Sequence, residues 1–303
     1  MDQHKYIDLH THTTESDGSM TPTELVRHAF EQGLSAVAVT DHDTVKGVEQ
    51  AIEEGKRLGI EVIPGVEISV DLSQREISLY PPSLNPNQQD SSADVIPEMH
   101  LLGYFFRNQY DLIRNTLDQL RDNREQRNPK IVHKLNELGF AMDMEEVAVL
   151  AAGGVVGRPH IARVMVDKGY VASVEEAFDK YLANGRPAYF RKDKLTPAEG
   201  ISEILRAGGV PVLAHPIYLY MNIEQLDHLL GQLVEIGLKG IEAHYTDNTE
   251  KQTADLLMLA EKHHLLITGG SDFHGSFKPD IEIGRGRGGL RVAYSLLQQL
   301  KQA

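Results

Sequence analysis

Short apolar runs alternate with longer amphipathic segments in the first and last thirds of the chain. Runs that have the length and composition of buried strands lie at 6–9, 36–39, 61–64, 210–214, 240–243 and 265–268. Amphipathic segments predict helices at 22–32, 45–58, 197–207, 223–236, 248–262 and 292–301. This alternation of strands and helices predicts an α/β fold with a parallel sheet.

The middle third follows a different pattern. Residues 75–80 alternate like an edge strand, 81–97 are polar and proline-rich and predict a surface loop, and 99–106 return to strand character. From 110 to 191 only helical patterns occur, and they predict helices at 110–126, from Pro129 to about 139, and from a Ser173 cap to about 182. We therefore expect an α/β domain in two parts, 1–108 and 193–303, around an inserted helical subdomain at 109–192.

Composition and charge narrow the class of protein. The 303 residues are 41% hydrophobic and 24% charged, which is ordinary for a soluble globular protein. The chain has no cysteine, so a metal ion would need histidine, aspartate and glutamate ligands. The formal net charge of −14 argues against a surface for long nucleic acid. Neither a long apolar run nor an apolar N-terminal segment occurs, so no membrane association is expected and the cytoplasm is the expected location.

Metal-binding side chains follow the predicted strands, at the end where each strand finishes. They are His10, His12, Asp41, His42, Glu67, His215, Asp272 and His274. Because the carboxyl ends of parallel strands meet at one edge of a sheet, these side chains are expected to converge. Side chains two residues apart on an extended segment point the same way, so His10 and His12 could bind one ion together. The pattern predicts a metal centre at this edge.

Six motifs occur in order along the chain: HTHTTESDG, VTDHD, PGVEIS, HLLGY, LAHP and GSDFHG. Over residues 6–275 they resemble the polymerase-and-histidinol-phosphatase (PHP) superfamily of metal-dependent phosphoesterases. Within the helical segment, GRPH at 157–160 and GRPAY at 185–189 resemble the branch that hydrolyses nucleoside 3',5'-bisphosphates and trims short RNA from its 5' end. The resemblance implies a distorted (β/α)7 barrel.

The resemblance also implies two or three divalent ions, which would be Mn, Fe or Zn. The ligands implied for the first ion are His10, His12, Glu67 and Asp272. Those implied for the second ion are Asp17, His42 and His274. A third ion would share Glu67 and add His100 and His215. Some relatives have histidine at the position of Asp17, and a carboxylate there favours Mn or Fe over Zn.

The substrate implied by the resemblance is a nucleotide or a short RNA, with inorganic phosphate as a product. Arg158 suits a bidentate grip on one phosphate, and His160 could donate a hydrogen bond beside it. Arg186, in the second of the two helical-segment motifs, is a further candidate for substrate binding. The bound ions would meanwhile activate a water that attacks the other phosphate.

Three residues are candidates for catalysis: His215, His274 and Asp41. The general acid for the leaving group is left open between a metal-bound water, His215 and His274. Asp8 and Asp41 are expected to orient ligand histidines. His244 follows a strand and could line the pocket, but Glu242 and His244 could equally support the ligands from behind.

Other functions are compatible with parts of this pattern. A histidinol-phosphate-type or other small-molecule phosphomonoesterase would not need Arg158 and His160, and Arg158 could instead pair with a local carboxylate. An amidohydrolase shares the His-x-His opening, but such sites usually include a bridging lysine, and no lysine follows a predicted strand. A metal-dependent nucleotide-binding accessory domain would be expected to lack some ligands, whereas every expected position is filled.

Overall fold

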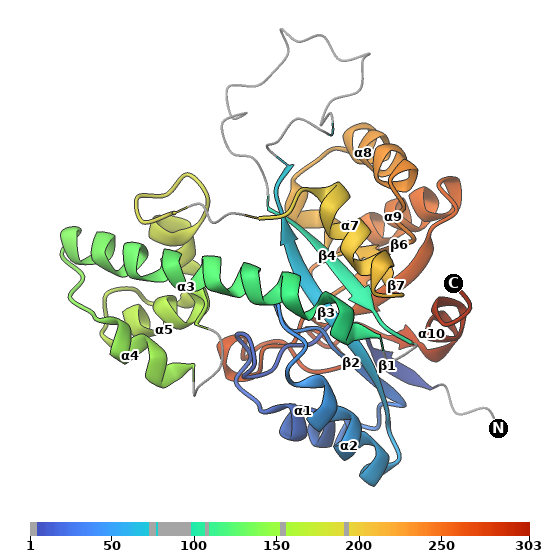
Figure 1. The fold of residues 1–303 in the computed structure, drawn as a ribbon, viewed down its shortest axis with the longest axis horizontal. Helices are drawn as coiled ribbons and strands as arrows, with labels where there is room; N and C mark the ends of the chain where they lie inside the picture. The colour runs from blue at the N-terminus through green and yellow to red at the C-terminus, as the bar shows by residue number, and fades with distance from the viewer. Residues whose placement is uncertain (1–4, 73–76, 78–97, 107–108, 152–155, 191–193) are drawn as a thin grey trace, which may run out of the picture.

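The structure is a computed structural model that describes residues 5–72, 77, 98–106, 109–151, 156–190 and 194–303. Its centre is an eight-stranded sheet (Figure 1) with the strand order β7-β6-β5-β4-β3-β2-β1-β8. The strands are β1 (Tyr6–Asp8), β2 (Ala36–Val39), β3 (Glu61–Val70), β4 (Met99–Tyr104), β5 (Val210–Leu213), β6 (Gly240–Tyr245), β7 (Leu266–Gly270) and β8 (Val292–Ala293). Strands β1 to β3 are parallel to one another, as are β5 to β7, and β4 is antiparallel to both of its neighbours.

The sheet curves into a nearly closed barrel, because β7 returns to the end of β1. The Leu9 N–H donates to the Gly269 carbonyl at 3.2 Å, and the Asp272 N–H donates to the His10 carbonyl at 2.9 Å. Gly270 permits this approach, since a Cβ there would lie 2.4 Å from the backbone nitrogen of His10. The distorted (β/α)7 barrel is therefore confirmed: β1 to β7 form it, and the reversed β4 distorts it.

Most helices begin within a few residues of the positions predicted from the sequence. They are α1 (Pro22–Glu31), α2 (Val48–Leu58), α3 (Arg114–Glu137), α4 (Met144–Leu150), α5 (Arg158–Asp167), α6 (Val174–Ala177), α7 (Pro197–Arg206), α8 (Ile223–Glu235), α9 (Glu250–Lys262) and α10 (Tyr294–Leu300). Short 3₁₀ turns occupy Tyr110–Ile113, Pro216–Leu219 and Gly275–Phe277, and Phe178–Leu182 is a π-helical turn. Capping boxes at Thr21 and Thr196 begin α1 and α7. None of the helices in the described ranges is both long and apolar enough to cross a membrane.

The predicted break at Pro129 is wrong, because α3 runs through this residue without interruption. Proline in a helix interior removes one hydrogen bond and costs about 3 kcal/mol. Packing at both ends of α3 offsets this cost. Leu117 and Leu120 belong to the core that covers one face of the barrel, whereas Ile131 and Leu135 belong to a separate core of the inserted helices.

Helices α4 and α5 and the C-terminal half of α3 lie to one side of the barrel, whereas α3 begins against the barrel itself (Figure 1). They share a hydrophobic core with α6 and the π-helical turn, built around buried residues such as Ile161, Met165 and Leu182. This is the part of the chain in which the sequence predicts an inserted subdomain. The boundaries at 109 and 192 stay a prediction.

Two further predictions concern the last helix and the segment 75–97. The predicted helix at 292–301 begins two residues late, because Val292 and Ala293 form β8 and pair antiparallel with Tyr6 and Ile7 of β1. This pairing buries Val292 completely. The predicted edge strand at 75–80 and the predicted loop at 81–97 lie outside the described residues, apart from Ile77, which is buried.

Candidate metal centre

The side chains predicted at the strand ends meet at one end of the barrel. His10 and His12 follow β1, and His42 follows β2. Glu67 lies inside β3 and forms a parallel bridge with His42. Because β4 runs antiparallel to β3, His100 near its start reaches the same end of the barrel. His215, Asp272 and His274 follow β5 and β7 and complete the cluster.

The first group of possible ligands has four buried members whose ligand atoms lie within 4.8 Å of one another: His10, His12, Glu67 and Asp272. His12 Nε2 lies 3.1 Å from both Glu67 Oε2 and Asp272 Oδ1. His10 Nε2 lies 3.1 Å from the same Glu67 oxygen and 3.6 Å from the same Asp272 oxygen. The structure thus brings together all four residues expected to bind the first ion.

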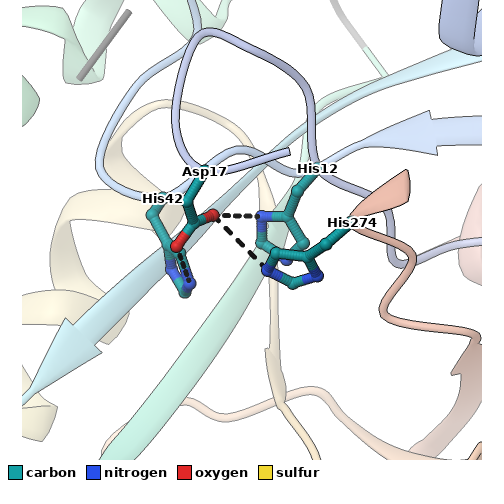
Figure 2. A group of neighbouring side chains, drawn as sticks. All are labelled: His12, Asp17, His42 and His274. Carbon is teal, nitrogen blue, oxygen red and sulfur yellow. Dashed lines mark ion pairs between the residues drawn. The ribbon is translucent and has the colours of Figure 1, made fainter. Parts of the chain in front are cut away.

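The second group shares His12 with the first (Figure 2). Its members are His12, Asp17, His42 and His274. Asp17 Oδ1 lies 3.7 Å from His12 Nδ1 and 3.4 Å from His274 Nε2, and Asp17 Oδ2 lies 3.7 Å from His42 Nε2. The sequence led us to expect Asp17, His42 and His274 here. His12 was expected only in the first group, but its two ring nitrogens face different groups.

The third group differs more from the expectation. Its ligand atoms come from His42, Glu67 and His100, whereas the expected set was Glu67, His100 and His215. His215 is nevertheless close, since its Nε2 lies 2.8 Å from Glu67 Oε1, and His100 Nδ1 lies 2.7 Å from the same oxygen. Both histidines therefore contact one oxygen of Glu67.

The donor set fits divalent cations. Among the described residues, both ring nitrogens of His12 and Nδ1 of His42 are buried without a hydrogen-bond partner. The atoms around Asp17 stand 3.4 to 3.7 Å apart, which is too long for good hydrogen bonds. Two ligands that each lie about 2.1 Å from a tetrahedral ion are separated by about 3.4 Å. Ions bound among these atoms would satisfy the buried groups and neutralise three carboxylates.

The carboxylates and rings perturb one another strongly. Burial alone would raise the pKa of Glu67, yet the neighbouring histidines hold it well below its ordinary value. Burial works against protonation of His12, but Asp272 and Glu67 outweigh it and raise the pKa of that ring to about 9. Burial lowers the pKa of His42 to about 3, against the opposing effect of Glu67. Metal ions compete with protons for the same nitrogens, so proton release is expected to accompany metal binding.

Glu242 of β6 contacts two of the clustered residues, His10 and His215. His10 Nδ1 lies 3.0 and 3.2 Å from its two carboxylate oxygens, and the backbone N–H of His215 donates to one of them at 2.8 Å. Nε2 of the same ring is directed at Glu67 and Asp272, so a proton kept on Nδ1 by Glu242 would leave Nε2 available to bind an ion. These contacts agree with the supporting role considered for Glu242.

Asp8 and Asp41 act on the backbone and on hydroxyl groups. Asp41 accepts from the N–H and the hydroxyl of Thr13, both at 2.7 Å, and from the Ser16 hydroxyl at 2.6 Å. Asp8 accepts from the backbone N–H of His10 at 3.2 Å and from Ser271. We expected Asp8 and Asp41 to orient ligand histidines. In the described residues, neither carboxylate forms a hydrogen bond with an imidazole ring. They shape the two turns that present the ligands.

Two residues that contact Asp272 were missed in the sequence analysis. The Tyr245 hydroxyl donates to Asp272 Oδ2 at 2.8 Å, and Lys278 Nζ lies 2.6 Å from the same oxygen. Tyr245 ends β6, so its place at a strand end could have drawn attention to it, but Lys278 lies in an irregular segment. Asp272 and His215 also have positive φ angles of 56° and 26°. Strained backbone of this kind is typical of functional sites.

The start of α5 lies directly against the cluster. A Cβ added to Gly157 would stand 3.6 Å from the Asp17 side chain. The next residue, Arg158, forms a 2.7 Å ion pair with Glu98, donates to the Leu182 carbonyl at 3.1 Å, and stacks near Phe178. Arg158 is thus held in place by polar and aromatic contacts.

The other two candidates for substrate binding differ in their surroundings. His160 is buried, and its Nδ1 accepts a 2.9 Å hydrogen bond from the Gly157 N–H, so its Nε2 carries the proton. Its ring stands edge-on to Phe277, which follows His274 closely in the chain. Arg186 is exposed on a turn.

Comparison with known proteins identifies the family. The PHP domain family matches residues 8–196. The 5'-3' exoribonuclease Rnm of Escherichia coli (strain K12) is 34% identical over 280 residues, which cover 92% of this chain and 88% of that protein. A 3',5'-nucleoside bisphosphate phosphatase of Chromobacterium violaceum is 27% identical over 286 residues, covering 92% and 90% of the two chains.

A solved structure resembles the whole chain as well. A protein from Bifidobacterium adolescentis, assigned as a metal-dependent phosphoesterase, superposes with a TM-score of 0.79 at 28% identity. The match covers 98% of this chain and 95% of the other. The shared barrel, the clustered histidines and carboxylates, and the sequence matches agree with one another. The chain therefore belongs to the PHP domain family of metal-dependent phosphoesterases.

Proposed function

We propose that this phosphoesterase hydrolyses nucleoside 3',5'-bisphosphates, the 5' ends of short oligoribonucleotides, or both. The observation that carries this proposal is the contact between the start of α5 and the metal centre, through Gly157 and Asp17. Arg158 and His160, the two candidate phosphate-binding residues, follow Gly157 in the first turn of this helix, which supports the proposal. The names of the Escherichia coli and Chromobacterium violaceum relatives support the same substrate class.

A second phosphate would have to replace Glu98 as the partner of Arg158. Glu98 lies 2.7 Å from Arg158 Nη2 and 3.0 Å from Lys194 Nζ, so one carboxylate bridges two cationic side chains. Burial alone would raise the pKa of Glu98, but Arg158 and Lys194 hold it well below its ordinary value. A carboxylate held in this way stands where a phosphate oxygen would bind, since both anions suit the same donors.

The ligand assignments follow the three groups. His10, His12, Glu67 and Asp272 would hold one ion, and Asp17, His42 and His274 would hold another with His12 between them. Glu67, His100 and either His42 or His215 would hold a third. Bound Mn, Fe or Zn ions would supply an activated water and neutralise the phosphoryl oxygens.

Hydrolysis joins the oxygen of one water to phosphorus and breaks an ester P–O bond. A bisphosphate then gives inorganic phosphate and an alcohol, whereas cleavage of the first phosphodiester of an RNA gives a nucleoside monophosphate and a shortened RNA with a free hydroxyl group. The alcohol oxygen must gain one proton. His215 and His274 lie within the cluster. They are candidates to position the group that donates this proton. Asp41 is 1% exposed and its carboxylate accepts three hydrogen bonds, so we assign it to shaping the turn before Asp17 rather than to contact with substrate.

The test is hydrolysis after metal removal and reloading with Mn²⁺, measured as inorganic phosphate released from the phosphomonoesters and as nucleotide released from the RNA. The substrates are adenosine 3',5'-bisphosphate, AMP, histidinol phosphate and a 5'-phosphorylated RNA trimer. Fast turnover of the bisphosphate or the trimer, with slow turnover of the other two, is the expected result. Turnover of histidinol phosphate alone would overturn the proposal and point to a small-molecule phosphomonoesterase.

A further inference from the structure

Lys278 approaches the metal centre from the segment that follows the 3₁₀ turn Gly275–Phe277. Its Nζ lies 2.6 Å from Asp272 Oδ2, which also accepts from the Tyr245 hydroxyl at 2.8 Å. The other oxygen, Oδ1, faces the histidines, at 3.1 Å from His12 Nε2 and 3.4 Å from His274 Nδ1. The two oxygens of Asp272 therefore serve different partners, and Lys278 occupies the one turned away from the rings.

Lys278 and Asp272, which form this ion pair, differ in their exposure to solvent. The Lys278 side chain is 34% exposed, whereas that of Asp272 is 7% exposed. Lys278 thus reaches the buried carboxylate from a partly exposed position. Burial disfavours the charged form of Lys278, but Asp272, Asp17 and Glu67 outweigh burial and raise its pKa. The group is a stable cation beside three carboxylates.

No other lysine or arginine in the described parts of the chain forms an ion pair with the cluster. An ammonium group is a compact charge that binds phosphate oxygens well. The carboxylates attract Lys278 strongly only while their charge is not neutralised by bound cations. When it is neutralised, the strongest remaining anion near Nζ is the phosphate group of a bound substrate.

We propose that Lys278 is a catalytic residue that binds a non-bridging oxygen of the scissile phosphate. This rests on the proposed hydrolysis of phosphate esters. Lys278 donates a hydrogen bond and transfers no proton, so it adds positive charge where negative charge increases during the reaction. Its ion pair with Asp272 holds the flexible side chain over the centre until a phosphate group takes the place of the carboxylate.

The same contacts would also fit a purely structural role for Lys278, and that role predicts a different effect of replacing it. If Lys278 only braced Asp272, its loss would weaken metal binding, by about 10- to 100-fold as is common for groups that orient ligands. In our proposal Tyr245 keeps Asp272 Oδ2 occupied after Lys278 is replaced. Metal affinity then changes little, and the affinity for phosphate falls.

The experiment compares wild type, Lys278→Met and Lys278→Arg. The stripped proteins are titrated with Mn²⁺ by calorimetry, and the loaded proteins are then titrated with inorganic phosphate. We expect Lys278→Met to bind Mn²⁺ like wild type and to bind phosphate about tenfold more weakly, with Lys278→Arg in between. In steady-state hydrolysis of p-nitrophenyl phosphate, kcat of Lys278→Met should fall by about 10- to 100-fold.

Lys262→Met is the matched control, because Lys262 forms a 2.7 Å ion pair with Asp227 on the helical surface of the barrel. It should change neither titration. Unchanged phosphate affinity in Lys278→Met, or a loss of Mn²⁺ affinity that accounts for the loss of phosphate binding, would overturn the proposal. Neither titration uses a nucleotide, so a failure of the proposed bisphosphate or RNA substrate would leave these results interpretable.

Discussion

The side chains of Arg158 and Glu98 form a 2.7 Å ion pair between the first residue of α5 and the residue before β4. This pair links the inserted helices to the barrel beside the metal centre. It also means that the residue expected to bind a second phosphate already has an anionic partner. Substrate binding at this position is therefore an exchange of one anion for another, and this gives two opposite predictions.

Replacement of Arg158 by Ala should raise KM for adenosine 3',5'-bisphosphate by about 10- to 100-fold, because a charge-assisted contact with one phosphate is lost. Metal content should stay that of wild type, since Arg158 contacts none of the candidate ligands in the described structure. Steady-state kinetics and elemental analysis measure both quantities. Arg163→Ala is the control, because Arg163 lies on the same helix in an exposed pair with Asp167. An unchanged KM, or a metal-free Arg158→Ala protein, would contradict the prediction.

Replacement of Glu98 by Gln should have the opposite effect and lower KM for the bisphosphate by about three- to tenfold. The neutral amide competes less well than a carboxylate for Arg158 and Lys194. The same kinetic assay tests this, with Glu137→Gln as a control for an exposed pair. A higher KM for Glu98→Gln would mean that the carboxylate positions Arg158 for substrate instead of competing with it.

Glu242→Gln should weaken Mn²⁺ binding by about 10- to 100-fold, because Glu242 directs the Nε2 atom of His10 into the first group. Competition with a chelator of known affinity measures the change. The exposed Glu146, which pairs with Lys168, provides the control variant Glu146→Gln. Equal Mn²⁺ affinity in Glu242→Gln and wild type would show that packing alone orients His10.

Removal of divalent ions should lower the midpoint of thermal unfolding by about 5 °C or more. Without ions, the buried carboxylates of Asp17, Glu67 and Asp272 repel one another, and only the neighbouring histidines and Lys278 offset their charge. Scanning calorimetry of stripped and Mn²⁺-reloaded protein tests this. Identical midpoints would argue that the clustered side chains do not bind Mn²⁺.

Pro129→Ala should stabilise the protein by about 1 to 3 kcal/mol, since it restores a hydrogen bond within the uninterrupted helix α3. Pro129 is exposed, so the substitution disturbs no core packing. Urea unfolding followed by circular dichroism measures the change. A loss of stability would indicate that the proline limits the unfolded chain more than it strains the helix.

Local patterns predicted the alternation of strands and helices and most of the cluster, whereas the closed barrel was implied by the resemblance to the PHP family. Apolar runs followed by His10, His42 or Asp272 mark a strand and a ligand in the same few residues. The predictions that were wrong or missing depend on contacts between residues far apart in the sequence. The course of α3 through Pro129 depends on two separate cores, and β8 depends on pairing with β1 at the other end of the chain. The roles of Glu242 and Lys278 depend on which side chains they face, and no local pattern records this.

The first group draws its members from both ends of the chain. His10 follows the first strand, whereas Glu242, which orients it, lies 232 residues later, and Asp272 follows the last barrel strand before β8. During synthesis on the ribosome, the N-terminal histidines are made long before their partners. A nascent or truncated chain that lacks β6 and β7 has no complete first group, so metal loading and hydrolysis begin only once synthesis has passed Asp272.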